Sequence, residues 1–241
     1  ALDISQAANA AKSHTVVKAA KSGEDLKNCE VIVITAGIPR KPGMSRDDLL
    51  LTNAKIMQAV LEDIKKYAPN SKIIIVSNPL DAMVYAALKI LKFPREHVIG
   101  MAGILDSARM SHFICEKLGY GAGQIESSVM GGHGDAMVPL VNYSTVAGVS
   151  LPELLSKEDI EDIVSKTKNG GLQIVKLLET GSAYYAPAHA TSLMVEAILY
   201  NNKKIYPCSV MLDGEYDCKN VVSGVPVMLG SNGIEKIIEL K

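Results

Sequence analysis

The sequence has no tryptophan, only two phenylalanines, and no excess of charge of either sign. Its 25 Lys and Arg residues stand against 26 Asp and Glu residues, which gives a formal net charge of −1. Domains that bind a nucleic-acid backbone usually carry a basic excess or a basic patch, so this balance argues against nucleic acid as a partner. Hydrophobic residues make up 48% of the chain, which is enough to bury a core and excludes a disordered or fibrous protein.

Long hydrophobic runs are also missing. Apolar runs such as those at 31–36 and 72–76 are far shorter than the roughly 20 residues that a membrane-spanning helix needs. Residues 1–14 have neither the basic start nor the continuous apolar stretch of a secretory signal, and their spacing predicts an amphipathic helix. We therefore expect a cytoplasmic protein without a membrane partner.

Cysteine is scarce as well, with four residues at positions 29, 115, 208 and 218. They form no C-x-x-C pair and no cluster with histidine, so reduced thiols are favoured over a disulfide framework or a zinc site. We predict no metal centre.

Short β-branched runs do alternate with longer helical patterns through the first half of the chain. The predicted strands are at 15–19, 31–37, 72–77 and 97–103, and the predicted helices are at 46–67, 80–91 and 105–118. Val and Ile runs without polar alternation are typical of a parallel sheet covered on both faces. Ser45 followed by Asp48 has the spacing of a capping box at the start of the first long helix. The pattern predicts a doubly wound α/β sheet of Rossmann type.

After about Gly119 the pattern changes to short strands and turns, followed by longer elements. These are predicted as helices at 157–179 and 188–200 and as strands at 205–212 and 225–229. The change predicts a second, mixed α+β domain. We place the boundary so that residues 1–103 form the first domain and residues 104–241 the second.

Small residues and an amide follow two predicted strands, in TAG (35–37) and SNP (77–79). An open α/β sheet binds its ligand beyond the carboxyl ends of its strands, which is where these residues would lie. Asn78 alone could equally be a turn former before Pro79, and Ala36 could serve close packing of strand against helix. The charged loop at 39–48 is a further candidate for ligand contact.

Three other features could carry chemistry. Asp106 and Arg109 are three residues apart on a predicted helix, where an ordinary ion pair is the simpler interpretation. His133 stands in the turn GGHGD, where an imidazole can face a cleft or have a structural role. GYGAG at 119–123 has the wrong spacing for a dinucleotide-binding turn and follows a helix, so we reject it.

Taken together, PRKPGMSR, SNP, LDSAR and GGHGD, in this order and spacing, resemble the lactate/malate dehydrogenase family, and most closely its bacterial malate dehydrogenases of lactate-dehydrogenase-like type. TGSAYYAPA (180–188) and GVPVMLG (224–230) extend the resemblance over essentially the whole chain. It implies a homodimeric or homotetrameric oxidoreductase that interconverts (S)-malate and oxaloacetate with NAD. A lactate or other 2-hydroxyacid dehydrogenase is the alternative within the enzyme class, and a catalytically silent partner-binding relative is the alternative outside it.

The resemblance also implies roles for five charged residues. His133 matches the histidine that exchanges a proton with the substrate, and Asp106 matches the carboxylate that orients it. Arg109 matches the residue that grips the substrate carboxylate through two parallel hydrogen bonds. Arg46 matches the loop arginine that polarises the reacting carbonyl. Arg40 stands where the family has arginine for substrates with a second carboxylate, so it favours malate over lactate.

For the cofactor, the resemblance implies contacts at the two strand ends and on the long helix. The residues concerned are Thr35, Ala36, Gly37, Asn53, Val76, Ser77 and Asn78. Asn78 is also expected to contact the substrate. The choice between NAD and NADP stays open at this point, because the family's discriminating acidic residue has no counterpart in the sequence.

The family's first strand with its G-x-G-x-x-G turn, and its second strand, would precede Ala1, and its long final helix would follow Lys241. We therefore expect this sequence to be a truncated or incomplete version of a longer enzyme. A literal fragment of this kind would expose a wide sheet edge and would bind NAD weakly, because the helix N-terminus that holds the diphosphate is missing.

Overall fold

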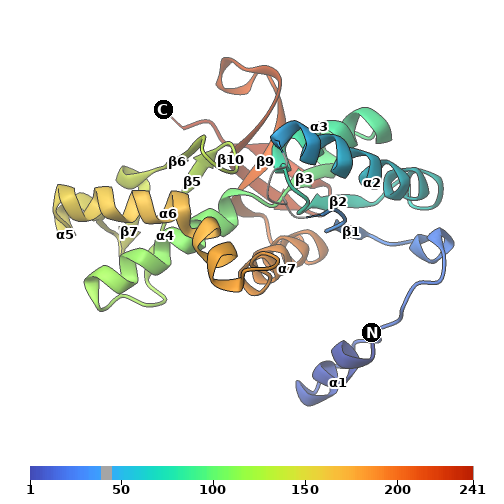
Figure 1. Ribbon diagram of the computed structural model, residues 1–241, viewed down its shortest axis with the longest axis horizontal. Helices are drawn as coiled ribbons and strands as arrows, with labels where there is room; N and C mark the ends of the chain where they lie inside the picture. The colour runs from blue at the N-terminus through green and yellow to red at the C-terminus, as the bar shows by residue number, and fades with distance from the viewer. Residues whose placement is uncertain (39–44, 241) are drawn as a thin grey trace.

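The structure, a computed structural model, describes residues 1–38 and 45–240. Figure 1 shows a large sheet at the centre, helices against it, and the N-terminal helix standing apart from the rest. This helix, α1 (Leu2–Ala10), buries none of its residues. The helix predicted at the start of the chain is therefore present, but it contributes nothing to the core.

The first part of the sheet is parallel. Strand β1 (Val31–Ile34) pairs with β2 (Lys72–Ile75), which pairs with β3 (Val98–Gly100). Helices α2 (Arg46–Tyr67) and α3 (Leu80–Leu91) connect these strands. The predicted alternation of strand and helix is confirmed in this region.

Each face of this parallel sheet is covered by helices. Ile73 and Ile75 of β2 pack on one face with residues of α2 and α3, including Met57. Ile74 points to the opposite face and packs with Met194 of helix α7 (Tyr185–Leu199). Both faces of the strand are buried, which explains why β2 shows no polar alternation.

The same sheet continues into the second half of the chain, in the order β1-β2-β3-β9-β10-β5-β6, with β11 paired to β10. The junction is a single antiparallel pairing of Gly100 in β3 with Ser209 in β9. The further strands of this sheet are β5 (Val129–Gly131), β6 (Met137–Pro139), β9 (Lys204–Asp213), β10 (Lys219–Gly230) and β11 (Gly233–Ile237). The sequence does not predict β11, and β9 and β10 are longer than predicted.

The remaining elements surround this sheet. A second sheet contains β4 (Ile125–Glu126), β7 (Thr145–Val146) and β8 (Val149–Ser150). The helices are α4 (Gly103–Leu118), α5 (Leu151–Leu154) and α6 (Lys157–Leu178). The 3-10 turns are η1 (Gly23–Leu26), η2 (Arg95–His97), η3 (Val141–Tyr143) and η4 (Glu215–Asp217).

The strand predicted at 15–19 is wrong, because these residues have no regular structure. In the described chain, β1 forms the edge of the sheet, and no strand pairs with its outer side. Val16 is 77% exposed. A β-branched run forms a strand only where a neighbour supplies hydrogen bonds and a surface to pack against, and residues 15–19 have neither here.

Two local features position the helices that matter for the site. Ser45 and Asp48 form the predicted capping box at the start of α2, with each side chain bonded to the main chain of the other. Helix α4 begins tightly against β5, since a Cβ at Gly103 would lie 2.2 Å from the main-chain oxygen of Val129. Glycine therefore permits the close approach that brings α4 to the start of β5.

Within the described ranges, no helix has the length and apolar character needed to cross a membrane.

Candidate active site

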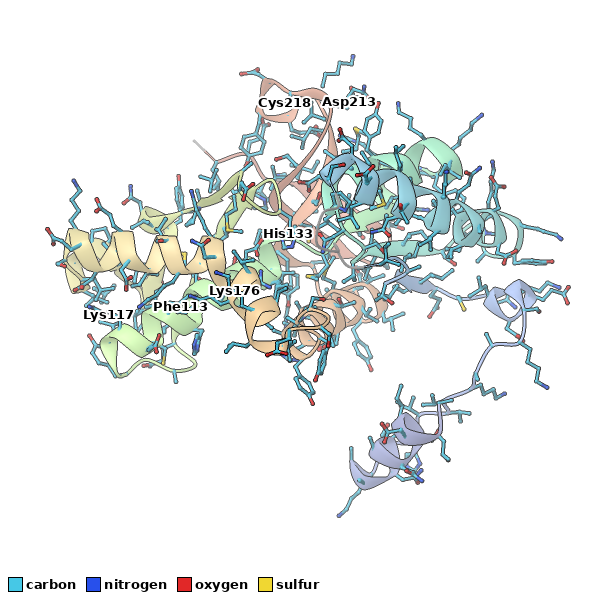
Figure 2. The ribbon with its side chains drawn as sticks, viewed as in Figure 1. Phe113, Lys117, His133, Lys176, Asp213 and Cys218 are labelled. Carbon is cyan, nitrogen blue, oxygen red and sulfur yellow. The ribbon has the colours of Figure 1, made fainter. Side chains whose placement is uncertain are left out.

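The centre of the site is a histidine bonded to a buried carboxylate. Asp106, in the first turn of α4, is 1% exposed, and His133 lies in the turn after β5. Nδ1 of His133 and Oδ2 of Asp106 are 2.8 Å apart. Figure 2 shows His133 near the middle of the molecule, close to α4. Because Asp106 holds Nδ1, the opposite ring nitrogen, Nε2, is directed away from the carboxylate.

The second oxygen of the same carboxylate holds an arginine. Nη1 of Arg109 donates to Oδ1 of Asp106 at 3.0 Å, so the predicted i,i+3 pair is present. Nε of Arg109 is buried and has no hydrogen-bond partner among the described residues. A partly satisfied guanidinium of this kind has donor capacity left for an anion.

Helix α6 lies against this guanidinium with two consecutive glycines. A Cβ at Gly171 would lie 3.4 Å from Nη2, 3.5 Å from Nη1 and 3.6 Å from Cζ of the Arg109 guanidinium. A Cβ at Gly170 would contact the aliphatic part of the same side chain at 3.4 Å. The absence of side chains here lets the α6 backbone lie close to Arg109, a contact that sequence reasoning missed.

The turn that carries His133 depends on glycine. Gly131 has φ +80°, and a Cβ there would lie 2.5 Å from the main-chain oxygen of Ala136. The main-chain N–H of His133 donates to Oδ2 of Asp81 at 3.1 Å. Sequence analysis missed Asp81, because its position after SNP resembles that of any acidic residue in the first turn of a helix.

Asn53 ties together the two strand ends predicted to bind the cofactor. Its side chain is 1% exposed, and Oδ1 accepts the N–H of Ile38 at 2.8 Å. Nδ2 donates to the main-chain oxygens of Ile38, at 3.1 Å, and Asn78, at 2.6 Å. In addition, the hydroxyl of Ser77 donates to the main-chain oxygen of Ala36 at 2.5 Å. These hydrogen bonds connect the carboxyl ends of β1 and β2, where the cofactor residues are predicted.

The carboxyl ends of β1 and β2 are open to a ligand at several points. Thr35, Gly37 and Asn78 are exposed, whereas Ser77 is buried and Val76 is partly buried. Gly37 has φ +148°, and a Cβ there would come within 3.1 Å of the Asn53 side chain. Exposed, glycine-containing backbone at the carboxyl ends of parallel strands is the usual setting of a nucleotide in an open α/β sheet.

Two predicted residues belong to the loop before α2. Arg40 lies outside the described residues, and Arg46 is the first residue of α2, with its side chain outside the described part. The roles expected for these two arginines stay predictions.

The remaining reactive groups do not form a site of their own. In the described part of the chain, no three His, Cys, Asp or Glu residues are grouped so that they could hold a metal ion. The four cysteines are free thiols, and burial raises the pKa of the Cys208 thiol well above its usual range.

The comparisons with known proteins agree with this geometry. Residues 1–100 match the family model of the lactate/malate dehydrogenase NAD binding domain, and residues 104–241 match the alpha/beta C-terminal domain of the same family. A malate dehydrogenase from Sulfurimonas denitrificans is 65% identical over 240 residues, which cover 100% of this chain and 75% of the relative.

Solved structures give the same result. The apo malate dehydrogenase of Picrophilus torridus superposes with a TM-score of 0.96 at 44% identity, covering 100% of this chain and 77% of that one. The lactate dehydrogenase of Cryptosporidium parvum, complexed with lactic acid and nicotinamide adenine dinucleotide, superposes with a TM-score of 0.95 at 39% identity, covering 100% and 78%.

The structure combines a Rossmann-type sheet, whose strands have exposed carboxyl ends, with a histidine and an arginine bonded to one carboxylate. Together with the match to an NAD-binding domain, this defines an NAD-dependent oxidoreductase. The chain belongs to the lactate/malate dehydrogenase family, and its first hundred residues are that family's NAD-binding domain. The fold class, the family and the cofactor predicted from the sequence are confirmed.

Proposed function

We propose that this protein is an NAD-dependent malate dehydrogenase, which interconverts (S)-malate and oxaloacetate. The observation that carries the proposal is the shared carboxylate of Asp106, which holds His133 on one oxygen and Arg109 on the other. A group that can exchange a proton and a group that can bind an anion are thereby placed side by side. The relatives named malate dehydrogenase, at 60% to 65% identity over the whole chain, support the same activity.

The exposed carboxyl ends of β1 and β2 fit NAD. We propose that the cofactor contacts the two strand ends and the helix residue that links them, namely Thr35, Ala36, Gly37, Asn53, Val76, Ser77 and Asn78. The exposed backbone at Gly37 and Asn78 supports this placement, since a dinucleotide needs close approach to main chain at these strand ends. When bound, NAD supplies the acceptor for the hydride that leaves the malate carbon.

His133 is the proposed proton carrier. With Nδ1–H donated to Asp106, Nε2 is free to accept the proton of the malate hydroxyl, and it returns this proton to the carbonyl oxygen during oxaloacetate reduction. The buried carboxylate of Asp106 holds the orientation of the ring. Because both of its oxygens are bonded, the cost of burying this charge is offset.

The arginines are the proposed anion-binding groups. Arg109 binds the substrate carboxylate next to the reacting carbon, and its incompletely satisfied guanidinium supports this role. From the family pattern, Arg46 polarises the carbonyl in the transition state and also contacts the substrate, as does Asn78. Arg40 pairs with the second carboxylate of malate, which would otherwise be buried without a partner.

We also propose two domains, residues 1–103 and residues 104–241, and assembly into a homodimer or homotetramer. Large apolar side chains that are exposed in the single chain support association, including Leu177 at 83%, Tyr185 at 81% and Tyr200 at 75% exposure. Sedimentation velocity measures the assembly, and a purely monomeric protein at micromolar concentration would contradict it. Free cysteines are consistent with a reducing compartment, and we propose the cytoplasm.

The activity is tested by following NADH oxidation on mass-verified protein, first with oxaloacetate and then with pyruvate. We expect kcat/KM for oxaloacetate to exceed that for pyruvate by at least about 100-fold, because an unpaired Arg40 would be left in the closed site with pyruvate. A preference for pyruvate would make the protein a lactate dehydrogenase, and no turnover of any 2-oxoacid would leave a non-catalytic relative.

A further inference from the structure

We propose that Asp81 is a positioning residue for the catalytic histidine, an inference that rests on the proposed function of His133. Asp81 lies in the first turn of α3, whereas His133 follows β5, 52 positions later in the chain. Its Oδ2 accepts the main-chain N–H of His133 at 3.1 Å. An acidic residue in a first turn would ordinarily be explained by the helix dipole alone, but this one reaches into the active site.

The carboxylate of Asp81 is itself held in place from the other side. The hydroxyl of Ser209 donates to Oδ1 at 2.6 Å, and Ser209 is completely buried in β9. Ser209 pairs with Gly100 on one neighbouring strand and with Gly224 on the other, so its position is set by the sheet. A Cβ at Gly132 would come within 3.3 Å of Oδ2 of Asp81, so the turn closely approaches the carboxylate.

His133 is therefore held at two points by two different helices. Asp106 of α4 holds the ring, and Asp81 of α3 holds the backbone. A hydrogen bond of 2.8 Å at Nδ1 tolerates a displacement of only a few tenths of an ångström, and a catalytic group must be kept within about 0.5 Å of its working position. Release of the backbone would weaken the bond between the ring and Asp106.

Asp81 also connects His133 to the strand ends where we propose that the cofactor binds. It lies three residues after Asn78, whose main-chain oxygen accepts the amide of Asn53 at 2.6 Å. The start of α3 thus joins the strand-end turn to the His133 turn through a few residues of rigid structure. This connection keeps the proton carrier in register with the site of hydride transfer.

The test compares Asp81→Ala and Asp81→Asn with a matched control in the full chain. The control is Asp159→Ala, which removes an aspartate from the first turn of α6 that pairs with Lys117. Asp81→Ala should lower kcat for oxaloacetate reduction by about 10- to 100-fold and leave the Kd for NADH, measured by fluorescence titration, within about two-fold. The KM for oxaloacetate should change much less than kcat, because Arg109, the proposed substrate-binding group, keeps its own bond to Asp106.

Asp81→Asn should stay within about three-fold of the unmodified protein in kcat, because its amide oxygen still accepts from His133 while its NH₂ faces Ser209. Asp159→Ala should keep kcat within about two-fold, because it removes a first-turn carboxylate of the same kind without touching the His133 turn. If Asp81→Ala does not fold, Asp81→Glu displaces the carboxylate by one methylene and should show the same loss of kcat. The inference is overturned by an unchanged kcat in the folded variant, or by an equal loss of kcat in Asp159→Ala.

A failure of the proposed function is distinguishable from a failure of this inference. If the unmodified protein turns over no 2-oxoacid, the proposed function fails. The NMR signal of the His133 Nδ1 proton, which reports the bond to Asp106 and needs no turnover, then decides the role of Asp81. Loss or upfield movement of this signal in Asp81→Ala but not in Asp159→Ala supports the positioning role, and an identical signal in both variants overturns it.

Discussion

Nδ1 of His133 lies 2.8 Å from Oδ2 of Asp106, although the two residues are 27 positions apart in the chain. The contact is made possible by the residue next to Asp106. The hydroxyl of Ser107 accepts the main-chain N–H of Val129 at 3.0 Å, which anchors the start of β5 to α4. Two consecutive residues of one helix thus hold both the strand and the turn that follows it, and the His133 ring is presented to the carboxylate at a set distance.

Replacement of this carboxylate should impair chemistry more than folding. In Asp106→Asn, a single amide oxygen can serve either His133 or Arg109 but not both, so we expect kcat to fall by about 10²- to 10⁴-fold. Steady-state NADH oxidation with oxaloacetate measures the loss. Asp213→Asn, on the exposed β9–β10 hairpin, is the matched control and should remain near the unmodified rate. An Asp106→Asn rate within three-fold of the unmodified rate would refute the role of the pair.

Arg109 should not tolerate replacement by lysine. An ammonium group cannot both donate to Asp106 and present a second parallel donor to a carboxylate, so Arg109→Lys should raise KM for oxaloacetate by about 100-fold or more. The control is Arg95→Lys, which changes a guanidinium that is bound to Glu215 and not to a residue of the site. That variant should keep its KM, and an equal rise in both variants would argue against substrate binding by Arg109.

Arg40 is the predicted determinant of substrate choice. Arg40→Gln removes the charge that pairs with the second carboxylate, so kcat/KM should shift from oxaloacetate toward pyruvate by about 10-fold or more. The ratio of the two kcat/KM values measures the shift. An unchanged preference for oxaloacetate would mean that the discrimination is made elsewhere in the site.

The ion pair between Arg95 and Glu215 predicts a pH-dependent contribution to stability. Two hydrogen bonds, at 3.0 and 2.7 Å, join the groups, and Arg95 lowers the pKa of Glu215 from 4.5 to about 2. A carboxylate with a depressed pKa stabilises the fold above the unfolded pKa, and this stabilisation is lost as pH falls from about 4.5 toward 2.

Urea unfolding of the unmodified protein and of Glu215→Gln tests this dependence. At pH 7 the unmodified protein should be more stable by about 1 to 3 kcal/mol, because the partly exposed pair is screened by solvent. The difference should shrink as the pH is lowered through this window. A difference that is the same at pH 7 and pH 3 would show that the charge of Glu215 does not contribute.

The turn that carries His133 can be tested with two glycines of the same backbone conformation. Gly131 and Gly123 both have φ +80°, but a Cβ at Gly131 meets the oxygen of Ala136 at 2.5 Å, whereas a Cβ at Gly123 meets nothing within 4 Å. Gly123→Ala should therefore cost only backbone strain, about 1 kcal/mol, and Gly131→Ala about 2 kcal/mol more together with a loss of kcat. Thermal unfolding and kcat measure the two effects, and equal losses would contradict the steric argument.

Local patterns in the sequence predicted much of the α/β framework. The bounds predicted for α2 and α3, 46–67 and 80–91, are those observed, because a serine cap and a proline turn mark their starts. The run KIIIVS indicated a strand buried on both faces, as Ile73 and Ile74 are. Such signals lie within a few residues of the element they specify.

The errors concern features that depend on distant partners. Residues 15–19 have the composition of a strand, but no strand of the described chain pairs with them. Asp81 and Ser209 look unremarkable in the sequence, and only the fold brings them to the His133 turn. The role of the glycines at 170 and 171 likewise depends on a distant partner, because they lie against Arg109, which belongs to another helix.

The sequence by itself determined which helices and β-branched runs form the framework and, through the family pattern, which histidine, aspartate and arginines are available for catalysis. These follow from caps, periodicity and residue chemistry, which act over short stretches of chain. Only the tertiary structure decided that one carboxylate serves both His133 and Arg109 and that Asp81 holds the turn that carries His133. Those bonds join residues from separate elements, and their geometry depends on how the helices and strands pack.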